Sequence, residues 1–261
     1  MNIVVLIKQV PDTWSERTLS DSDKTLDRAS SDAVLDEINE RAVEEALKLK
    51  EGSGEGEVTI LTVGPDRATD AIRKALSMGA DKAVHVNDEA LHGSCAVTTA
   101  KVLAKAIGTV EGVDLVLVGN EATDGRTGAM AAMLGELQGW PALTHALELT
   151  VEGSTVRVKR ETEEGGCDVE ASLPAVVSVA EKINEPRYPS FKGIMAAKKK
   201  PVSKLGVSDL GFDPSEVGLA GSLTTVESFA PRPPKQGGQK VEDEGDGGAK
   251  IAEFLVGQKL I

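Results

Sequence analysis

The chain has 261 residues, with 29 basic and 42 acidic side chains and a formal net charge of −13 at pH 7. This acidity argues against general nucleic-acid binding, which needs many Lys and Arg contacts to phosphate. The two cysteines are far apart and the three histidines lack metal-ligand spacing, so neither a disulfide scaffold nor a metal site is indicated. The first apolar run is too short for a signal sequence and no stretch approaches a membrane span, so we expect a soluble cytoplasmic protein.

Short apolar runs alternate with helical apolar spacing along the first part of the chain. The apolar runs are typical of parallel strands buried on both faces, and they cover 3–7, 58–63, 82–86, 114–118 and 173–180. The helical spacing covers 35–49, 68–76, 96–107 and 129–137. This alternation predicts a doubly wound α/β fold with a mostly parallel sheet covered by helices on both faces.

We expect a ligand at the carboxyl ends of these strands, where open α/β sheets bind nucleotides. The first strand end lacks a GxGxxG fingerprint, and the chain contains no GxxxxGK[ST] motif, which argues against an NTP hydrolase. The best candidate is the loop 119–128, GNEATDGRTG, which precedes a helical pattern. Its glycines, Gly119, Gly125 and Gly128, allow the backbone to approach a ligand closely.

Three side chains of this loop have expected roles. Thr127 is predicted to cap the following helix, whose first amides would then point toward a phosphate. Arg126 is a candidate for a bidentate phosphate contact, and Asp124 for either orienting the loop or binding a ribose hydroxyl. The alternative is an ordinary glycine-rich turn in which Thr127 is only a helix cap.

Residues 183–200, INEPRYPSFKGIMAAKKK, place apolar side chains among Pro, Gly, Lys and Arg directly after a buried strand. Phe191, Ile194 and Met195 on a stiffened basic loop are typical of a docking surface. The lysines 198–200 are expected to hold this segment in water. The alternative is a surface loop whose Phe191 packs on its own domain.

The chain offers few catalytic arrangements. His92 and Cys95 are candidates for a nucleophilic Cys/His pair. A simpler explanation of this stretch is that Ser94 caps a helix. Alternating residues at 155–160 and 168–171 predict a hairpin with solvated carboxylates at its turn. Glu161 is the candidate functional acid of this hairpin, because it adjoins Arg160 near the strand that leads to residues 183–200.

Beyond residue 200 the composition changes. The stretch 202–212 favours a short helix, and 231–248 is expected to form a linker without a core of its own. Residues 250–261 predict a helical, apolar-faced terminus that must pack on something, either a partner or its own domain. The sequence therefore predicts a nucleotide-binding domain at 1–200, which includes the hairpin 154–172, and an extended arm at 201–261.

Several motifs together resemble the beta (small) subunit of the electron transfer flavoprotein family. They are VLIKQV at 5–10, AVEEA at 42–46, ALSMGAD at 75–81, the loop 119–128, VKRE at 158–161, LPAVV at 173–177, NEPRY at 184–188 and IMAAKKK at 194–200. The similarity runs from residue 3 to 200 and more loosely to 261. It implies a three-layer sandwich of the adenine nucleotide alpha-hydrolase type, with the arm packed on a partner subunit.

The resemblance implies a buried AMP with a structural role. The AMP contacts would come from strand ends and the glycine-containing loop, at Leu6, Asp36, Asn39, Val63, Gly119, Ala122, Asp124, Gly125, Arg126, Thr127, Gly128, Ala129 and Met130. The amides of Gly128, Ala129 and Met130 would hold the phosphate. Family members often carry Asn or Gln at phosphate-contacting positions where this chain has Gly128 and Ala129, and Arg126 is expected to compensate.

The resemblance also implies a heterodimer with a larger alpha subunit that holds most of the FAD. Acyl-CoA and other dehydrogenases, as in fatty-acid oxidation, would dock on a set made of Tyr188, Phe191, Ile194 and Met195. Thr13 and Glu161 would lie near the flavin. Electrons would pass on to a membrane quinone oxidoreductase, and the chain would turn over no substrate of its own.

Three other functions stay open. A bifurcating flavoprotein subunit would hold a second FAD in place of AMP, but its loop typically reads closer to DGDTAQVGP than to the DGRTGAMAA found here, which favours AMP. A non-redox regulatory module would bind an adenine nucleotide as a homodimer without flavin. An ATP-using ligase or hydrolase would need a phosphate-gripping loop after the first strand, which residues 8–13 do not resemble.

Overall fold

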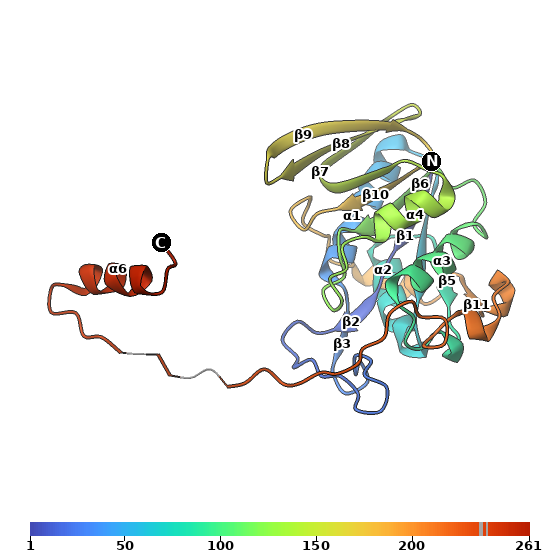
Figure 1. Cartoon of the computed structure of the whole chain (residues 1–261). Coiled ribbons are helices and arrows are strands. Elements are labelled where there is room, and N and C mark those ends of the chain that lie inside the picture. The colour runs from blue at the N-terminus through green and yellow to red at the C-terminus, as the bar shows by residue number, and fades with distance from the viewer. Residues whose placement is uncertain (235–236, 239) are drawn as a thin grey trace. The chain divides into compact units, whose positions relative to one another are not determined.

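The computed structural model describes residues 1–234, 237–238 and 240–261. By their internal contacts these residues form two units, Met1–Glu227 and Ser228–Ile261. The first unit is built on one nine-stranded sheet (Figure 1). Part of the predicted linker at 231–248, namely residues 235, 236 and 239, lies outside the described residues.

The large sheet has the strand order β11-β5-β4-β1-β6-β10-β7-β8-β9. The strands from β11 to β7 pair in parallel, and they are β1 (Asn2–Leu6), β4 (Glu57–Val63), β5 (Lys82–Val86), β6 (Leu115–Gly119), β7 (Ala142–Glu152), β10 (Ala175–Val179) and β11 (Val202–Leu205). Two further strands, β8 (Thr155–Thr162) and β9 (Gly165–Ser172), extend the sheet in antiparallel pairing. The predicted mostly parallel α/β fold is confirmed.

Helices cover both faces of the parallel part of the sheet. On one face lie α1 (Glu37–Ser53) and α2 (Thr69–Met78), and on the other lie α3 (Ala96–Ile107) and α4 (Met130–Gln138). Alternate residues of β1 enter the two cores: Ile3 and Val5 lie in the core with α1 and α2, whereas Val4 and Leu6 lie in the core with α3 and α4. Strands buried on both faces must be apolar throughout, which explains the continuous runs in the sequence.

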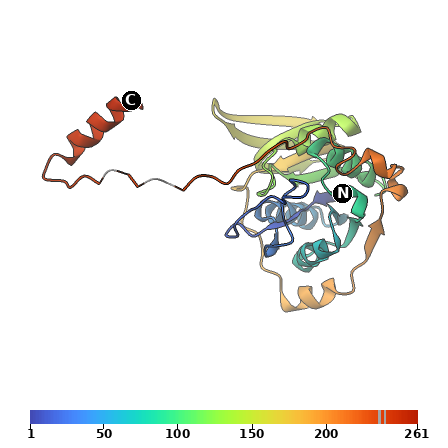
Figure 2. The ribbon, with the colours of Figure 1, turned by 60° about the horizontal axis from the view of Figure 1, so that its bottom comes forward.

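The docking segment differs from the predicted loop, because it contains helix α5 (Phe191–Ala197). The side chain of Ser190 caps this helix by accepting a hydrogen bond from the Gly193 amide at 3.0 Å. Helix α5 packs against α2 at the margin of the sandwich, where it appears in light orange in Figure 2. A helix this short forms only because tertiary packing supports it.

Three further elements differ from the predictions. The stretch 202–212 contains strand β11 and a 3₁₀ turn, Ser208–Leu210, so the expected arm begins with a strand of the main sheet. The strand β7 was not predicted. A small separate sheet pairs β2 (Gln9–Pro11) with β3 (Ala33–Leu35), and the loop 12–32 connects the two.

The second unit contains helix α6 (Gly247–Gly257), as the apolar terminal pattern predicts. No residue of α6 is buried, and Ile251, Phe254 and Val256 are more than half exposed. Among the described residues, no helix combines the length and apolar character that crossing a membrane requires.

Candidate functional site

Three neighbouring strands, β4, β1 and β6, end at the same edge of the sheet with Val63, Leu6 and Gly119. Gly119 allows a close approach of α1, because an added Cβ would lie 2.7 Å from Asn39 Nδ2 and 2.9 Å from Ile38 Cγ2 and would displace them. Helix α1 therefore packs directly against the end of β6. This packing brings the predicted residues Leu6, Asn39, Val63 and Gly119 to one edge of the sheet.

Asp36 is fully buried and joins the start of α1 to the loop that follows β6. One of its carboxylate oxygens accepts a hydrogen bond from the Ile38 amide at 3.0 Å, so Asp36 caps α1. The other oxygen accepts from both the amide and the hydroxyl of Thr123, at 2.7 Å and 2.8 Å. Because the protein itself supplies these donors, the geometry supports a bracing role for Asp36.

Asp124 lies at the centre of a partly buried ion-pair cluster. Its carboxylate, which has no exposed surface, binds Lys8 Nζ at 2.7 Å and Arg28 Nη2 at 2.8 Å. Burial opposes ionisation of Asp124, but the charges of Lys8 and Arg28 outweigh this effect and lower its pKa. Burial also lowers the pKa of Lys8. Since both carboxylate oxygens face cations, these contacts favour loop orientation over ribose binding as the role of Asp124.

The loop ends at the N-terminus of α4, which lacks a side-chain cap. The helix begins at Met130 with Ala129 in the N-cap position. The expected cap by Thr127 is wrong, because Gly128 lies between Thr127 and the helix with a left-handed φ of 67°. Within the described part of the chain, the amides of Gly128, Ala129 and Met130 have no backbone acceptor, so they are available to an anion.

The middle of the loop faces solvent. Gly125, Arg126 and Thr127 are exposed, and Ala122 is half-buried. Arg126 has a left-handed φ of 50°, and its Nε lies 3.9 Å from Glu121 Oε1. Its guanidinium therefore keeps most of its donors free for a ligand.

The two residues expected near a flavin lie on separate exposed elements. Thr13 is in the loop after β2, and Glu161 is near the end of β8, paired with Gly166 of β9. The predicted hairpin is confirmed, and its turn carries Glu163 and Glu164 in exposed positions.

Tyr188, Phe191, Ile194 and Met195 form an exposed apolar surface, which we call the docking patch. Their exposed fractions are 97%, 81%, 46% and 48%. The alternative in which Phe191 packs on its own domain is therefore wrong. Ala197, at the other end of α5, is buried and anchors the helix.

Polar contacts fix the backbone on either side of the docking patch. Arg187 binds Glu44 at 2.8 Å and Glu51 at 2.5 Å, both on α1. The hydrogen bonds to Glu51 and Glu44 raise the pKa of Arg187 above its usual range. Asn184 Nδ2 donates to Glu45 Oε2 at 2.9 Å. Helix α1 thus holds the segment that leads into α5.

Lys200 anchors the far side of this segment. Its Nζ donates to the carbonyl oxygens of Leu76 and Ala80, at 2.9 Å and 2.5 Å, at the end of α2. Burial lowers the pKa of Lys200. The expectation that Lys200 keeps the segment in water is therefore wrong, whereas Lys198 and Lys199 are exposed.

Residues 23–210 match the family model described as "Electron transfer flavoprotein domain". The chain belongs to the electron transfer flavoprotein family. The electron transfer flavoprotein subunit beta of Mycobacterium tuberculosis (strain ATCC 25618 / H37Rv) is 59% identical over 264 residues, which cover 100% of this chain and 99% of the relative. The subunit beta of Megasphaera elsdenii is 35% identical over 271 residues, which cover both chains completely. The resemblance to beta subunits of this family is thus confirmed.

A third relative has a different name. The "Caffeyl-CoA reductase-Etf complex subunit CarD" of Acetobacterium woodii is 35% identical over 242 residues, which cover 92% of each chain.

In this electron transfer flavoprotein family member, several site residues were missed from the sequence. Lys8, Arg28 and Thr123 brace the loop through partners roughly 90 to 120 residues away, so no local pattern reveals them. Asn120 Oδ1 is buried without a hydrogen-bond partner among the described residues. A ligand amine or hydroxyl would satisfy this acceptor.

The open nucleophilic pair does not form in this family member. His92 Nε2 lies 2.7 Å from Asp23 Oδ2, and Cys95 Sγ lies 3.4 Å from Thr98 Oγ1. Burial opposes ionisation of Cys95, but hydrogen bonds led by those of Thr98 lower its pKa to about 6. The expected cap by Ser94 is also wrong, because Cys95 occupies the N-cap position of α3.

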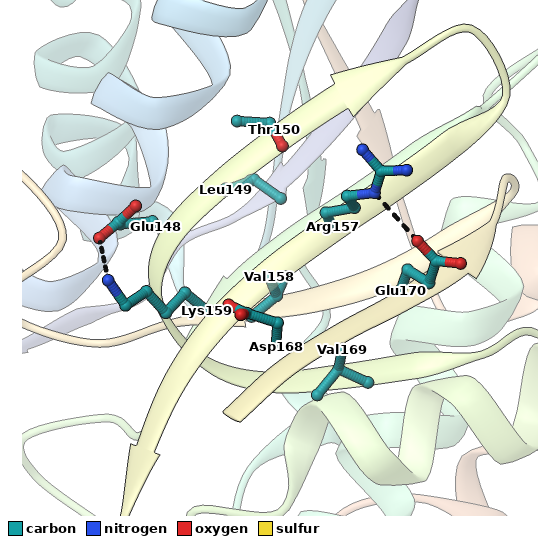
Figure 3. A pocket seen from close by; sticks show the side chains of 9 residues that line it. All are labelled: Glu148, Leu149, Thr150, Arg157, Val158, Lys159, Asp168, Val169 and Glu170. Atoms are coloured by element: carbon teal, nitrogen blue, oxygen red, sulfur yellow. Dashed lines mark hydrogen bonds and ion pairs between the residues drawn. The ribbon is translucent and has the colours of Figure 1, made fainter. Parts of the chain in front are cut away.

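A cavity of about 390 Å³ lies on the antiparallel extension of the sheet, away from the carboxyl ends of β4, β1 and β6 (Figure 3). Its charged side chains pair with each other across the strands, as in Glu148 with Lys159 and Arg157 with Glu170. The pairs are exposed, so this ladder is a solvated sheet surface. Its lining residues are Glu148, Leu149, Thr150, Arg157, Val158, Lys159, Asp168, Val169 and Glu170.

Proposed function

We propose that this chain is the small subunit of a heterodimeric electron carrier whose larger subunit holds most of the FAD. Acyl-CoA and other dehydrogenases reduce the FAD, and a membrane quinone oxidoreductase accepts the electrons. Bound FAD supplies the redox chemistry, and the small subunit turns over no substrate. Membership in the electron transfer flavoprotein family and 59% identity over the whole chain support this proposal. A cytoplasmic location remains our expectation.

The observation that best supports docking is that Phe191 is exposed although the backbone around α5 is held in place. Phe191 is 81% exposed, although contacts from Arg187 and Lys200 fix the backbone on both sides of α5. A fixed apolar surface binds with a smaller entropy cost than a flexible one. Burying Phe191 in a dehydrogenase pocket would contribute about 1.5–3 kcal/mol.

The carboxyl edge of the sheet supports a structural AMP. The amides of Gly128, Ala129 and Met130 would hold the phosphate at the start of α4, with Arg126 beside it. The buried, unpartnered Oδ1 of Asn120 fits a donor from the adenine or the ribose. Leu6, Val63 and Asn39 would contact the nucleoside, and Asp36 and Asp124 would keep the loop in place.

The docking proposal is tested by replacing the anchor. We expect Phe191→Ala to lower the rate of dehydrogenase-driven FAD reduction by roughly 10-fold, because about 1.5 kcal/mol or more of partner binding is lost. Stopped-flow absorbance of the flavin measures this rate with limiting dehydrogenase. The FAD content of the heterodimer should stay unchanged.

Val97→Ala provides a matched control, because Val97 is an exposed apolar residue of α3, 38% exposed. This variant should transfer electrons normally. An unchanged rate for Phe191→Ala, or a loss of FAD together with the rate, would show that Phe191 does not serve docking.

A second candidate function has one specific observation in its favour. Similarity to a subunit of a caffeyl-CoA reductase-Etf complex is compatible with a bifurcating carrier that binds a second FAD in place of AMP. The two candidates differ in the nucleotide that the heterodimer releases on denaturation. Family membership argues against the non-redox regulatory module and the ATP-using enzyme.

A further inference from the structure

Trp14 is 95% exposed although its backbone is held in place. Its amide donates to Asp12 Oδ1 at 3.0 Å, and the Ser15 amide donates to the Asp12 carbonyl at 3.0 Å. Pro11 precedes this turn and restricts the chain further. A large aromatic side chain on an ordered turn, with almost no contact to its own fold, is typical of an anchor for another protein.

The loop 12–32 that carries Trp14 is fixed to the carboxyl edge of the sheet. Arg17 Nη1 donates to the Thr123 carbonyl at 2.8 Å, and Arg28 binds Asp124 at 2.8 Å. Lys24 Nζ donates to the carbonyl of Glu227 at 2.5 Å. The loop that carries Trp14 therefore contacts the candidate nucleotide loop, and it also holds Glu227, the last residue of the first unit.

The docking patch lies at the opposite edge of the sheet. Helix α5 rests on the end of α2, since a Cβ on Gly193 would lie 2.4 Å from the Ser77 carbonyl oxygen. The strand β5 begins shortly after this point, at Lys82, so α5 is at the amino edge. Strands of this length separate the two edges by about 15–20 Å. The two aromatic surfaces thus suit different partners.

We propose that Trp14 anchors the larger subunit of the heterodimer, a proposal that rests on the proposed function. The exposed apolar residues next to Glu227 indicate which partner covers Trp14. Leu223 and Val226, just before Glu227, are 69% and 48% exposed, and Phe229, just after it, is 41% exposed. These apolar side chains lie just beside the point where Lys24 holds Glu227, and a partner that buries them gains apolar contact area.

A subunit that covers Leu223 and Val226 also reaches the loop 12–32, which holds Glu227 through Lys24 and carries Trp14. The chemistry of the site is an apolar pocket for the indole with an acceptor for its Nε1–H. A dehydrogenase on the docking patch leaves this surface untouched, so Trp14 serves assembly and the patch serves electron delivery.

Hydroxyl-radical footprinting of the intact heterodimer, read by peptide mass spectrometry, tests the assignment. Tyr188, which is 97% exposed, serves as the internal reference. We expect Trp14 to be protected from oxidation in the heterodimer while Tyr188 is oxidised readily. Addition of a dehydrogenase should then protect Tyr188 and leave Trp14 unchanged.

A second measurement is the heterodimer dissociation constant from sedimentation velocity. Trp14→Ala should raise it by about 30-fold or more, the loss typical of a buried tryptophan at the centre of an interface. Trp140→Phe is the control, because Trp140 is half-buried against the core of α3 and α4 and should leave the constant unchanged. Circular dichroism verifies that both variants fold.

Oxidation of Trp14 as fast as that of Tyr188 in the heterodimer would overturn the proposal, as would an unchanged dissociation constant for Trp14→Ala. Protection of Trp14 only after a dehydrogenase is added would also overturn it, since the residue would then belong to electron delivery. A failure of the wild-type chain to form any flavin-containing heterodimer is a different result, and it would contradict the proposed function itself.

Discussion

Asp36 shapes the candidate nucleotide site through three hydrogen bonds to a buried carboxylate. Its donors are the Ile38 amide and both the amide and hydroxyl of Thr123. Removing the carboxylate leaves these groups without a partner in a buried position, which is more costly than losing an exposed hydrogen bond. The loop 119–128 and the start of α1 therefore depend on this one residue.

We expect Asp36→Ala to lower the free energy of unfolding by about 3 kcal/mol and to deplete the AMP that we propose the heterodimer holds. Urea unfolding and nucleotide analysis of the heterodimer measure the two effects. Asp213→Ala is the matched control, because Asp213 caps an exposed 3₁₀ turn, Pro214–Glu216, and should cost about 1 kcal/mol or less. Equal losses for both variants would contradict the bracing role of Asp36.

His85 makes stability depend on pH near neutrality. It is fully buried in β5, its Nε2 lies 2.9 Å from the Gly64 carbonyl oxygen, and its Nδ1 has no partner among the described residues. Burial lowers the pKa of His85 in the folded state. The folded protein therefore binds this proton less readily than the unfolded chain does, and stability is lost as the pH falls below the unfolded value of about 6.5.

His85→Gln should flatten this loss, which is at most about 1.4 kcal/mol per pH unit for one proton. Urea unfolding at several pH values between about 5 and 7.5 measures the slope. His92→Gln is the control, since His92 has a side chain that is 61% exposed. A slope that persists in the His85 variant would place the titrating group elsewhere.

Helix α5 comes especially close to α2 at Gly193. The Cβ of an alanine at position 193 would lie 2.4 Å from the Ser77 carbonyl oxygen, which is closer than a real contact allows. The helix would have to move away from α2 and carry Phe191 and Ile194 with it. The element is thus positioned by packing on α2, as its short length requires.

Gly193→Ala should therefore slow dehydrogenase-driven FAD reduction and cost about 1–3 kcal/mol of stability, with the FAD content unchanged. Flavin reduction kinetics and urea unfolding measure the two effects. Gly52→Ala is the matched control. Gly52 lies on α1, and a Cβ added there would have no neighbouring atom within 4 Å among the described residues, so alanine should stabilise that helix by up to about 1 kcal/mol. Normal kinetics for Gly193→Ala would show that the position of α5 does not matter for docking.

The elements that were predicted from the sequence are those with a strong local pattern. Strands such as β1 and β6 are buried on both faces, so their apolar runs are unbroken, and helices such as α1 carry an apolar stripe. Strand β7 was missed, because it carries polar residues on its outer face and a left-handed residue, His145, with φ 62°. Helix α5 was missed because its stability comes from contacts with α2.

The candidate site divides in the same way. The loop 119–128 was predicted because a strand, glycines and a helix follow each other locally, and the exposed patch around Phe191 was predicted from residue types. The bracing contacts of Lys8 and Arg28 with Asp124 depend on the fold, since they join residues 116 and 96 positions apart. The placement of Thr127 outside the helix follows from the left-handed turn at Gly128, which a single sequence does not reveal.

At the scale of the whole molecule, the two candidate surfaces lie at opposite edges of one sheet. The carboxyl edge carries the loop for a nucleotide, and the amino edge carries α5 with the docking patch. The parallel sheet lies between them, so under the proposed function a dehydrogenase would dock away from the nucleotide and the larger subunit. We propose that this chain and a larger subunit together form a carrier that holds FAD and a structural AMP.

The nucleotide content of the purified heterodimer tests this claim most directly. The complex, co-expressed with its larger subunit, is denatured, and the released nucleotides are separated and quantified by chromatography. We predict a yellow complex that releases FAD and AMP in equal amounts. A colourless complex, or one that releases FAD without AMP, would contradict the account.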